Sequence, residues 1–204
     1  MLAGLSTPLP SLAAVILAGG LGRRMGYQQK GLLSLNQRPL IEHMLDKIRP
    51  YTEHIMISAN AAHEQYQAFG YPVVADLAPY QQRGPLAGIY SGITQLAEDI
   101  ELIQILPCDS PYLPNNLAWL FYQYLESHPD KDLVVAATDD KVHPVIMQCR
   151  RRILQPLKTY LDDPAKQNRV MGFIRNCDYG TIQFSNHQQF TNINEPSLLA
   201  GYRV

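Results

Sequence analysis

Short apolar runs alternate with segments of helical periodicity along most of this chain, and this alternation limits the fold more than any other feature. Strands separated by helices pair in parallel, with helices covering both faces of the sheet. The sequence therefore predicts an α/β fold of three layers, Rossmann-like, with a mostly parallel central sheet. The expected strands are Ala13–Ala18, His54–Ser58, Tyr71–Ala75, Glu101–Leu106, Asp132–Ala137 and Pro144–Gln148, and the expected helices are Pro39–Arg49, Ala61–Phe69, Leu86–Glu98, Leu113–Ser127 and Ile153–Leu161.

The length of the chain suits one domain. Its 204 residues are enough to bury a sizeable core, so we expect a single domain over 1–204. Pro8 and Pro10 suggest that residues 1–12 form a loose leader before the first strand. The end of the chain, from residue 162 onward, has a less regular pattern, with 170–174 and 181–184 as its ordered parts.

Charge and cysteine usage exclude several classes of protein. The net charge of −1 provides no broad attraction for nucleic acid or for an anionic membrane. No run approaches the roughly 18 apolar residues that a membrane span needs. The three cysteines, Cys108, Cys149 and Cys177, are far apart and lack metal-binding spacing, so we expect a reducing, cytoplasmic compartment.

A glycine-rich turn follows the first expected strand. Glycine has no Cβ, so backbone N–H groups in such a turn can approach a phosphate closely, and nearby cations supply charge for a polyphosphate. The spacing matches neither G-x-x-x-x-G-K-[ST] nor G-x-G-x-x-G. The alternative is an ordinary strand-ending turn with basic residues at the surface. The residues concerned are Leu17, Ala18, Gly19 and Gly20, followed by Arg24 and Lys30.

An aspartate directly follows the fourth expected strand. Asp109 lies between Pro107 and Pro111, and a carboxylate fixed there is well placed for Mg²⁺, which prefers oxygen ligands and often bridges to phosphates. The alternative is that Asp109 caps the next helix, although Pro114 opens that helix later. Ligands of parallel sheets bind beyond the carboxyl ends of the strands, so Asp109 and Lys30 are expected at one edge.

Two further strand ends carry polar side chains. Ser58 and Asn60 follow the second expected strand, and Asp76 follows the third, where a solvated loop aspartate is the alternative. The stretch Gly84-Pro85-Leu86-Ala87-Gly88 begins a helix, whose free N–H groups and dipole favour an anion. These residues would line the same edge of the sheet as the glycine-rich turn.

The pattern from Leu17 to Lys30, L-A-G-G-x-x-x-R-M-G-x-x-x-K, resembles the nucleotidyltransferase signature of molybdenum cofactor guanylyltransferases. The G-P-L-A-G stretch and the D-x-P context of Asp109 match that family as well. The ending with Asn192 and Asn194 is similar to the family's N-x-N-T-P pattern. The resemblance covers almost the whole chain.

Two of the departures from the family pattern lie at or beside expected site residues. Ser58 stands where the family usually has an asparagine that contacts the nucleotide, so a hydroxyl replaces an amide. Gln29 stands where an acidic residue often precedes the lysine. Neither departure removes the cations or the aspartate that the resemblance assigns to phosphates and metal.

The resemblance implies transfer of GMP from GTP to molybdenum-bearing molybdopterin, with release of pyrophosphate. It assigns catalysis to Arg24, Lys30 and Asp109, and Mg²⁺ binding to Asp109. It implies a nucleotide-binding N-terminal part, an acceptor-binding C-terminal third and transient contact with cofactor-insertion proteins or molybdoenzymes. The implied nucleotide-binding residues are Leu17, Ala18, Gly19, Gly20, Lys30, Ser58, Asp76 and Asp109.

Two other functions fit the same residues. One is a related NTP transferase that uses CTP or a sugar-phosphate acceptor, and the other is a non-catalytic module that binds and delivers a nucleotide or cofactor. A pure binding module would not need Arg24, Lys30 and Asp109 together, which favours an enzyme.

Overall fold

The computed structural model describes residues 8–19, 21–22, 28–81, 83–139, 141–166 and 168–194. Within these ranges, seven strands form one sheet in the order β11-β9-β10-β8-β1-β6-β7. Its strands are β1 (Leu12–Leu17), β6 (Ile55–Ser58), β7 (Val73–Val74), β8 (Leu102–Pro107), β9 (Leu133–Thr138), β10 (Lys141–Arg150) and β11 (Tyr179–Gln183). Two small hairpins pair β2 (Leu21–Gly22) with β3 (Gln28–Gln29) and β4 (Ser34–Leu35) with β5 (Arg38–Pro39).

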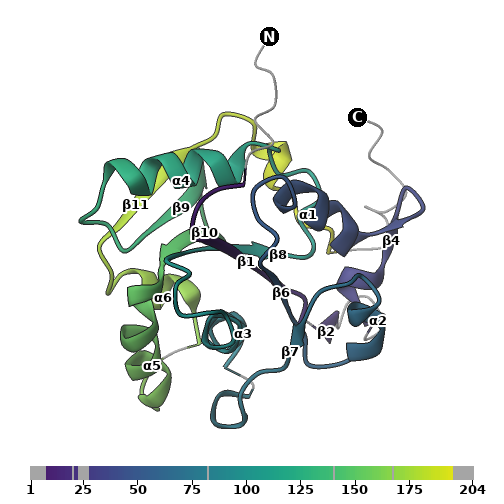
Figure 1. Ribbon diagram of the computed structural model, residues 1–204, viewed down its shortest axis with the longest axis horizontal. Helices are drawn as coiled ribbons and strands as arrows, with labels where there is room; N and C mark the ends of the chain where they lie inside the picture. Colours follow the sequence, from purple (N-terminus) through teal and green to yellow (C-terminus); the bar gives the residue numbers. More distant parts are fainter. Residues whose placement is uncertain are drawn as a thin grey trace.

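Helices cover both faces of the sheet, which confirms the expected three layers (Figure 1). Side chains of α1 and α4 pack into one core cluster, and those of α3, α5 and α6 into the other. The helices are α1 (Leu40–Ile48), α2 (His63–Gln67), α3 (Pro85–Thr94), α4 (Leu117–Ser127), α5 (Leu154–Asp162) and α6 (Val170–Ile174). Short 3₁₀ turns are η2 (Lys30–Leu32), η3 (Ala78–Tyr80), η4 (Arg151–Ile153) and η5 (His187–Phe190).

The position of β1 inside the sheet explains why its sequence is apolar throughout. Ala14 and Ile16 belong to the core under α1 and α4, whereas Ala13 and Val15 belong to the core under α3. Alternate side chains of a strand point to opposite faces, so a strand covered on both sides needs apolar residues at every position. Gly92 allows α3 to lie close to this strand, because a Cβ there would be 2.6 Å from Cγ1 of Val15.

The direction of the strands places four carboxyl ends at one edge. β1 is parallel to both β6 and β8, and β6 is parallel to β7. Leu17, the last residue of β1, is opposite Ser58 in β6 and Pro107 in β8. The segments that leave these strands therefore meet at the same edge, where ligands of such sheets bind.

One strand runs against the others. β10 is antiparallel to β8 and β9, and its register shifts between His143 and Met147. Pro144 lies inside this shift, and proline has no N–H to donate to the ladder. The sheet is mostly parallel, as expected, but β10 is longer than the predicted 144–148 because its pairing resumes on both sides of the irregularity.

The ends of several elements differ from the predictions. Leu9 is buried and its N–H donates to the carbonyl of Tyr51 at 2.7 Å, so the last part of the expected leader is packed. α4 begins at Leu117, not at the predicted Leu113, because the residue before a proline disfavours the helical conformation and Leu113 precedes Pro114. Residues 115–116 form a turn ahead of the helix. α3 ends at Thr94, before the predicted Glu98. Within the described ranges, no helix is both long and apolar enough to cross a membrane.

An arginine stabilises the end of α3. The guanidinium of Arg151 donates to the carbonyls of Ile93, Leu96 and Ile100, and also to that of Ala97. A cation at the C-terminus of a helix satisfies exposed carbonyl groups and opposes the helix dipole. The Arg151 guanidinium thus satisfies carbonyl groups at the end of α3 and in the turn that follows it.

Candidate active site

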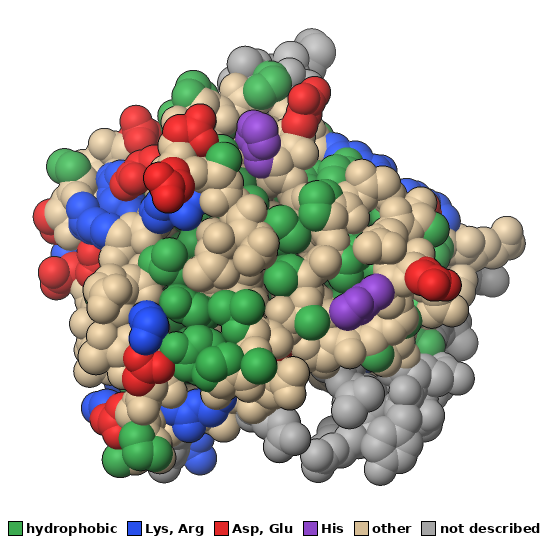
Figure 2. Space-filling view, turned by 60° about the horizontal axis from the view of Figure 1, so that its bottom comes forward, with side chains coloured by type: hydrophobic (Ala, Val, Ile, Leu, Met, Phe, Trp, Pro, Cys, Tyr) green, Lys and Arg blue, Asp and Glu red, His purple; other side chains and the backbone are tan. Residues whose placement is uncertain are grey.

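A cavity of about 880 Å³ lies at the carboxyl ends of β1, β6, β7 and β8. Polar residues that follow each of these strands line it, together with the start of α3. On the face shown in Figure 2, Lys, Arg, Asp and Glu side chains are intermixed. Among the described residues that line the cavity, Lys30 provides positive charge for a phosphate ligand.

Lys30 and Asp109 meet in this cavity. Nζ of Lys30 donates to Oδ2 of Asp109 at 3.1 Å and to Oδ1 of Asn194 at 2.6 Å. The side chains of Lys30 and Asp109 are 21% and 11% exposed, so water screens their attraction only in part. An ammonium group and a carboxylate thus stand side by side where a phosphate and a metal ion could bind.

The segment 191–194 holds Asp109 from the other side. The N–H of Ile193 donates to the carbonyl of Asp109 at 2.8 Å, and Oγ of Ser110 donates to Oδ1 of Asn192 at 2.9 Å. The side chain of Ile193 is fully buried in a small cluster with Leu35 and Leu40. This packing fixes the loop that carries Asp109.

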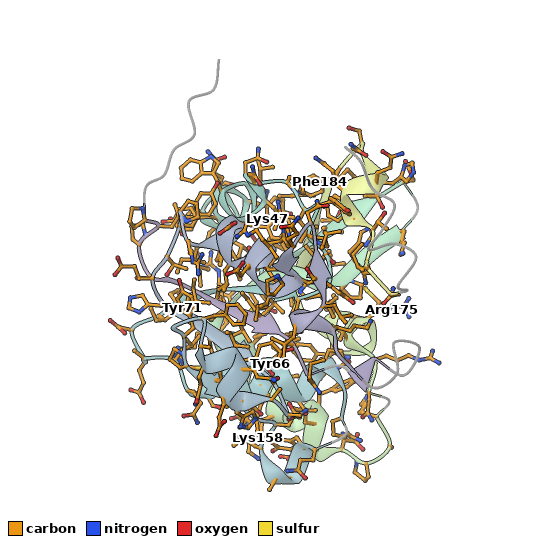
Figure 3. The ribbon with its side chains drawn as sticks, turned by 90° about the vertical axis from the view of Figure 1, so that its right-hand side faces the viewer. Lys47, Tyr66, Tyr71, Lys158, Arg175 and Phe184 are labelled. Atoms are coloured by element: carbon orange, nitrogen blue, oxygen red, sulfur yellow. The ribbon has the colours of Figure 1, made fainter. Side chains whose placement is uncertain are left out.

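The backbone next to Lys30 rests on a buried tyrosine. Tyr66 extends from α2 into the interior, where its side chain is fully buried (Figure 3). A Cβ on Gly31 would lie 2.8 Å from the Tyr66 hydroxyl, so glycine allows η2 to pack on this ring. Burial raises the pKa of Tyr66, which keeps the hydroxyl neutral. The position of Lys30 therefore depends on a close approach that a larger residue would prevent.

The end of the cavity beside β7 holds an aspartate and an asparagine. Nδ2 of Asn60 donates to Oδ2 of Asp76 at 2.8 Å, and the N–H of Asp76 donates to Oδ1 of Asn60 at 2.8 Å. Burial raises the pKa of Asp76, and the hydrogen bond from Asn60 opposes that rise. Gly19 lies close by, because a Cβ there would be 3.2 Å from Nδ2 of Asn60.

The first turn of α3 forms another wall of the cavity. Gly84 precedes it with φ of +64°, a conformation that glycine adopts without strain, and Pro85 is the first helical residue. Gly88 faces the cavity, since a Cβ there would be 2.6 Å from Oγ of Ser58 and 3.2 Å from Cδ2 of Leu17. The helix therefore presents backbone rather than side chain to the cavity.

Cys108 and His143 carry groups that can be reactive, but both side chains are buried and packed in the interior. Cys108 is fully buried, and burial raises the pKa of its thiol, so it is not a ready nucleophile. Nε2 of His143 lies 2.8 Å from Oγ1 of Thr138, and its ring packs on Phe190. Burial lowers the pKa of His143, so its imidazole is more readily neutral.

The structure brings most of the expected site residues together. Ala18 is an exception, because its side chain is fully buried in the core and its N–H donates to the carbonyl of Ser58 at 2.7 Å. Gly20 and Arg24 lie outside the described residues. The expected residues that line the common cavity are Leu17, Gly19, Lys30, Ser58, Asp76 and Asp109.

The sequence did not reveal the bonding partners of two site residues. Asn60 holds Asp76, and Asn194 holds Lys30. The strand-end position of Asn60 and the N-x-N ending were the available signals, but neither reveals its bonding partner. Among the side chains that the structure describes, no group of three or more His, Cys, Asp or Glu residues is arranged to hold a metal.

Comparisons with known proteins identify the family. The model of the MobA-like NTP transferase domain matches residues 14–178. The molybdenum cofactor guanylyltransferase of Aliivibrio salmonicida is 36% identical over 186 residues, which cover 91% of this chain and 92% of that protein. The domain match covers the glycine-rich turn, all of β6, β7 and β8, and β1 from Ala14 onward.

Solved structures show the same fold. Molybdopterin-guanine dinucleotide biosynthesis protein A from Archaeoglobus fulgidus has a TM-score of 0.75 and 18% identity, with 92% of this chain and 95% of that chain covered. A protein from Mycobacterium tuberculosis in complex with manganese has a TM-score of 0.62 and 16% identity, with 86% and 89% covered. With most of its length matched by the domain model and a third of its residues shared with a named relative, the chain is a nucleotidyltransferase of the molybdenum cofactor guanylyltransferase family.

Proposed function

We propose that this protein transfers GMP from GTP to molybdenum-bearing molybdopterin and releases pyrophosphate, which yields the guanine dinucleotide form of the cofactor. The observation that carries the proposal is the contact of Lys30 with Asp109 in a cavity at the carboxyl ends of parallel strands. The names of the relatives supply the nucleotide and the acceptor.

The reaction is a displacement at phosphorus. An oxygen of the terminal phosphate of molybdopterin attacks the α-phosphorus of GTP and forms a new P–O bond. The bond from the α-phosphorus to the oxygen that bridges to the β-phosphate breaks, and its electron pair leaves with pyrophosphate. The attacking phosphate is already ionised, so the enzyme contributes mainly position and charge neutralisation.

The residues of the cavity divide this work. The Lys30 ammonium would stabilise charge on the triphosphate, and Arg24 would join it from the glycine-rich turn. The backbone at Leu17, Gly19 and Gly20 would approach the nucleotide closely, whereas the N–H of Ala18 is already bonded to Ser58. Ser58 and Asp76 would contact the nucleoside, because β6 and β7 lie on the other side of β1 from β8, which precedes Asp109.

Asp109 is the proposed ligand of Mg²⁺. Its carboxylate is a hard oxygen donor in the cavity wall, and Lys30 and the backbone of Ile193 hold the residue in place. When bound, the ion would offset phosphate charge during transfer. The manganese complex of the related fold supports a divalent cation for this architecture.

The proposal also includes the setting of the reaction. We infer one domain over residues 1–204, with the acceptor bound by the C-terminal third, acting in the cytoplasm. Transient contact with cofactor-insertion proteins or molybdoenzymes would deliver the product.

Pyrophosphate release tests the proposal. The protein is mixed with Mg²⁺ and GTP, CTP or ATP, with and without molybdenum cofactor. We expect release with GTP only when the cofactor is present. Preference for CTP, or release with a sugar phosphate as acceptor, would support a related transferase, and nucleotide binding with no release would support a delivery module.

A further inference from the structure

Asn60 binds Asp76 at two points. One planar amide accepts from the backbone N–H of Asp76 and donates to its carboxylate, each at 2.8 Å. Two such bonds fix both the backbone and the rotation of the carboxylate. These bonds leave the Asp76 carboxylate little freedom to rotate toward a ligand, so its orientation is set before the nucleotide binds.

The contact leaves one carboxylate oxygen beside the cavity. Asn60 engages Oδ2, whereas Oδ1 lies near Gly88, where a Cβ would be 3.6 Å from it. Asp76, Asn60, Ser58 and Gly88 all line the cavity. Oδ1 is therefore the oxygen presented toward a bound nucleotide.

We propose that Asn60 is a positioning residue for nucleotide binding, which orients Asp76 so that its carboxylate accepts hydrogen bonds from the nucleoside. The inference rests on the proposed function, in which this cavity binds GTP. An ionised carboxylate only accepts hydrogen bonds, so its ligand groups are donors: N1–H and the 2-amino group of guanine, or the ribose hydroxyls. Asn60 acts on these groups through Asp76.

The contact between Asn60 and Asp76 should also affect how GTP binding depends on pH. Burial raises the pKa of Asp76, and the Asn60 amide opposes the rise. The residues that face Asp76 from the end of β6 and from α3 are Ser58, Asn60 and Gly88, and none of them is charged. Removing the amide leaves burial unopposed, so the pKa of Asp76 rises further. The carboxyl then takes a proton at a higher pH, which turns one of its oxygens into a donor and makes the group a weaker acceptor.

Calorimetric titration with GTP and Mg²⁺ tests this inference without any acceptor. We expect Asn60→Ala to weaken GTP binding about tenfold at pH 7, and to weaken it more as the pH falls toward 5. The double variant Asn60→Ala/Asp76→Ala should bind no more weakly than Asp76→Ala, because both changes remove one contact. Asn115→Ala, an exposed asparagine bonded to Lys47, is the matched control and should bind as wild type.

Two analogues identify the nucleoside donor. ITP lacks the 2-amino group of guanine, and 2′-deoxy-GTP lacks one ribose hydroxyl. The analogue whose affinity no longer depends on Asn60 marks the group that Asp76 contacts.

Each result either supports or contradicts the positioning role of Asn60. An Asn60→Ala protein with wild-type affinity and pH dependence overturns the inference, and so does a double variant much weaker than Asp76→Ala. A wild-type protein that binds GTP but transfers nothing contradicts the proposed function alone. If the wild type binds another nucleoside triphosphate, the same variants are titrated with that one, and a wild type that binds none overturns both.

Discussion

Nζ of Lys30 lies 3.1 Å from Oδ2 of Asp109, although 79 positions separate the two residues in the chain. Asp109 lies just after β8, whereas Lys30 follows β3 and begins η2, in the segment that leaves β1, the parallel neighbour of β8. The pair places an ammonium group and a hard oxygen ligand within a single cavity.

Asp109→Ala should lower kcat by about 10²–10³-fold while the protein stays folded, because the proposed metal ligand is lost. Pyrophosphate release measures the rate, and circular dichroism with a thermal melt checks the fold. Asp109→Asn keeps the side-chain volume and should be similarly impaired. Full activity in Asp109→Ala would remove this residue from the metal role.

Lys30→Met should lower kcat/KM by about 10²-fold or more, since it keeps most of the side-chain length but removes the charge from the triphosphate. Steady-state kinetics with varied GTP measures the loss. Lys47→Met, at a lysine of α1 bonded to exposed Asn115, is the control and should keep wild-type kinetics. Equal losses in both variants would mean that general charge, not the position of Lys30, matters.

Gly88→Ala should lower the free energy of unfolding by about 1–3 kcal/mol, because the new Cβ would be 2.6 Å from Oγ of Ser58. Denaturant unfolding measures the change, and GTP titration should show weaker binding, since α3 must shift at the cavity. Adding Ser58→Ala removes the contacting hydroxyl and should recover part of the lost stability. No recovery would locate the strain at Leu17 instead.

Ile193→Ala should lower the free energy of unfolding by about 2–4 kcal/mol and also reduce kcat. Its fully buried side chain anchors the segment whose N–H bonds to the carbonyl of Asp109. Ile174→Ala in α6 removes the same group from an equally buried position and should cost similar stability without reducing kcat. Denaturant unfolding and pyrophosphate release, run on both variants, separate the two effects.

The apolar strands were predictable because a strand that is buried on both faces has apolar residues at nearly every position. Residues 13–18, 101–106 and 132–137 were expected as strands, and β1, β8 and β9 begin and end within one residue of those bounds. The antiparallel direction of β10 was harder to predict from the sequence. Only Asp139 and residue 140 separate it from β9, with φ of +44° at Asp139, and a connection that short makes a hairpin rather than a parallel crossover.

The site was predictable only where the sheet determines it. Asp109 lies just after β8, and Lys30 belongs to the segment that leaves the parallel neighbour β1, so both were expected at the same edge of the sheet. The contact of Asn194 with Lys30 depends on how residues 191–194 return across the molecule, and no periodic pattern encodes that path. The bonds between Asn60 and Asp76 depend likewise on side-chain geometry at two loop positions.

The meeting of Lys30, Asp109 and Asn194 has a consequence for how loss of activity should be interpreted. These residues come from early, middle and late parts of the chain, so their alignment requires segments far apart in the sequence to be packed against one another. A molten globule that keeps its far-UV dichroism but loosens its side chains would already be inactive. Turnover is thus a stricter gauge of the native state than any spectroscopic measure of helix or strand.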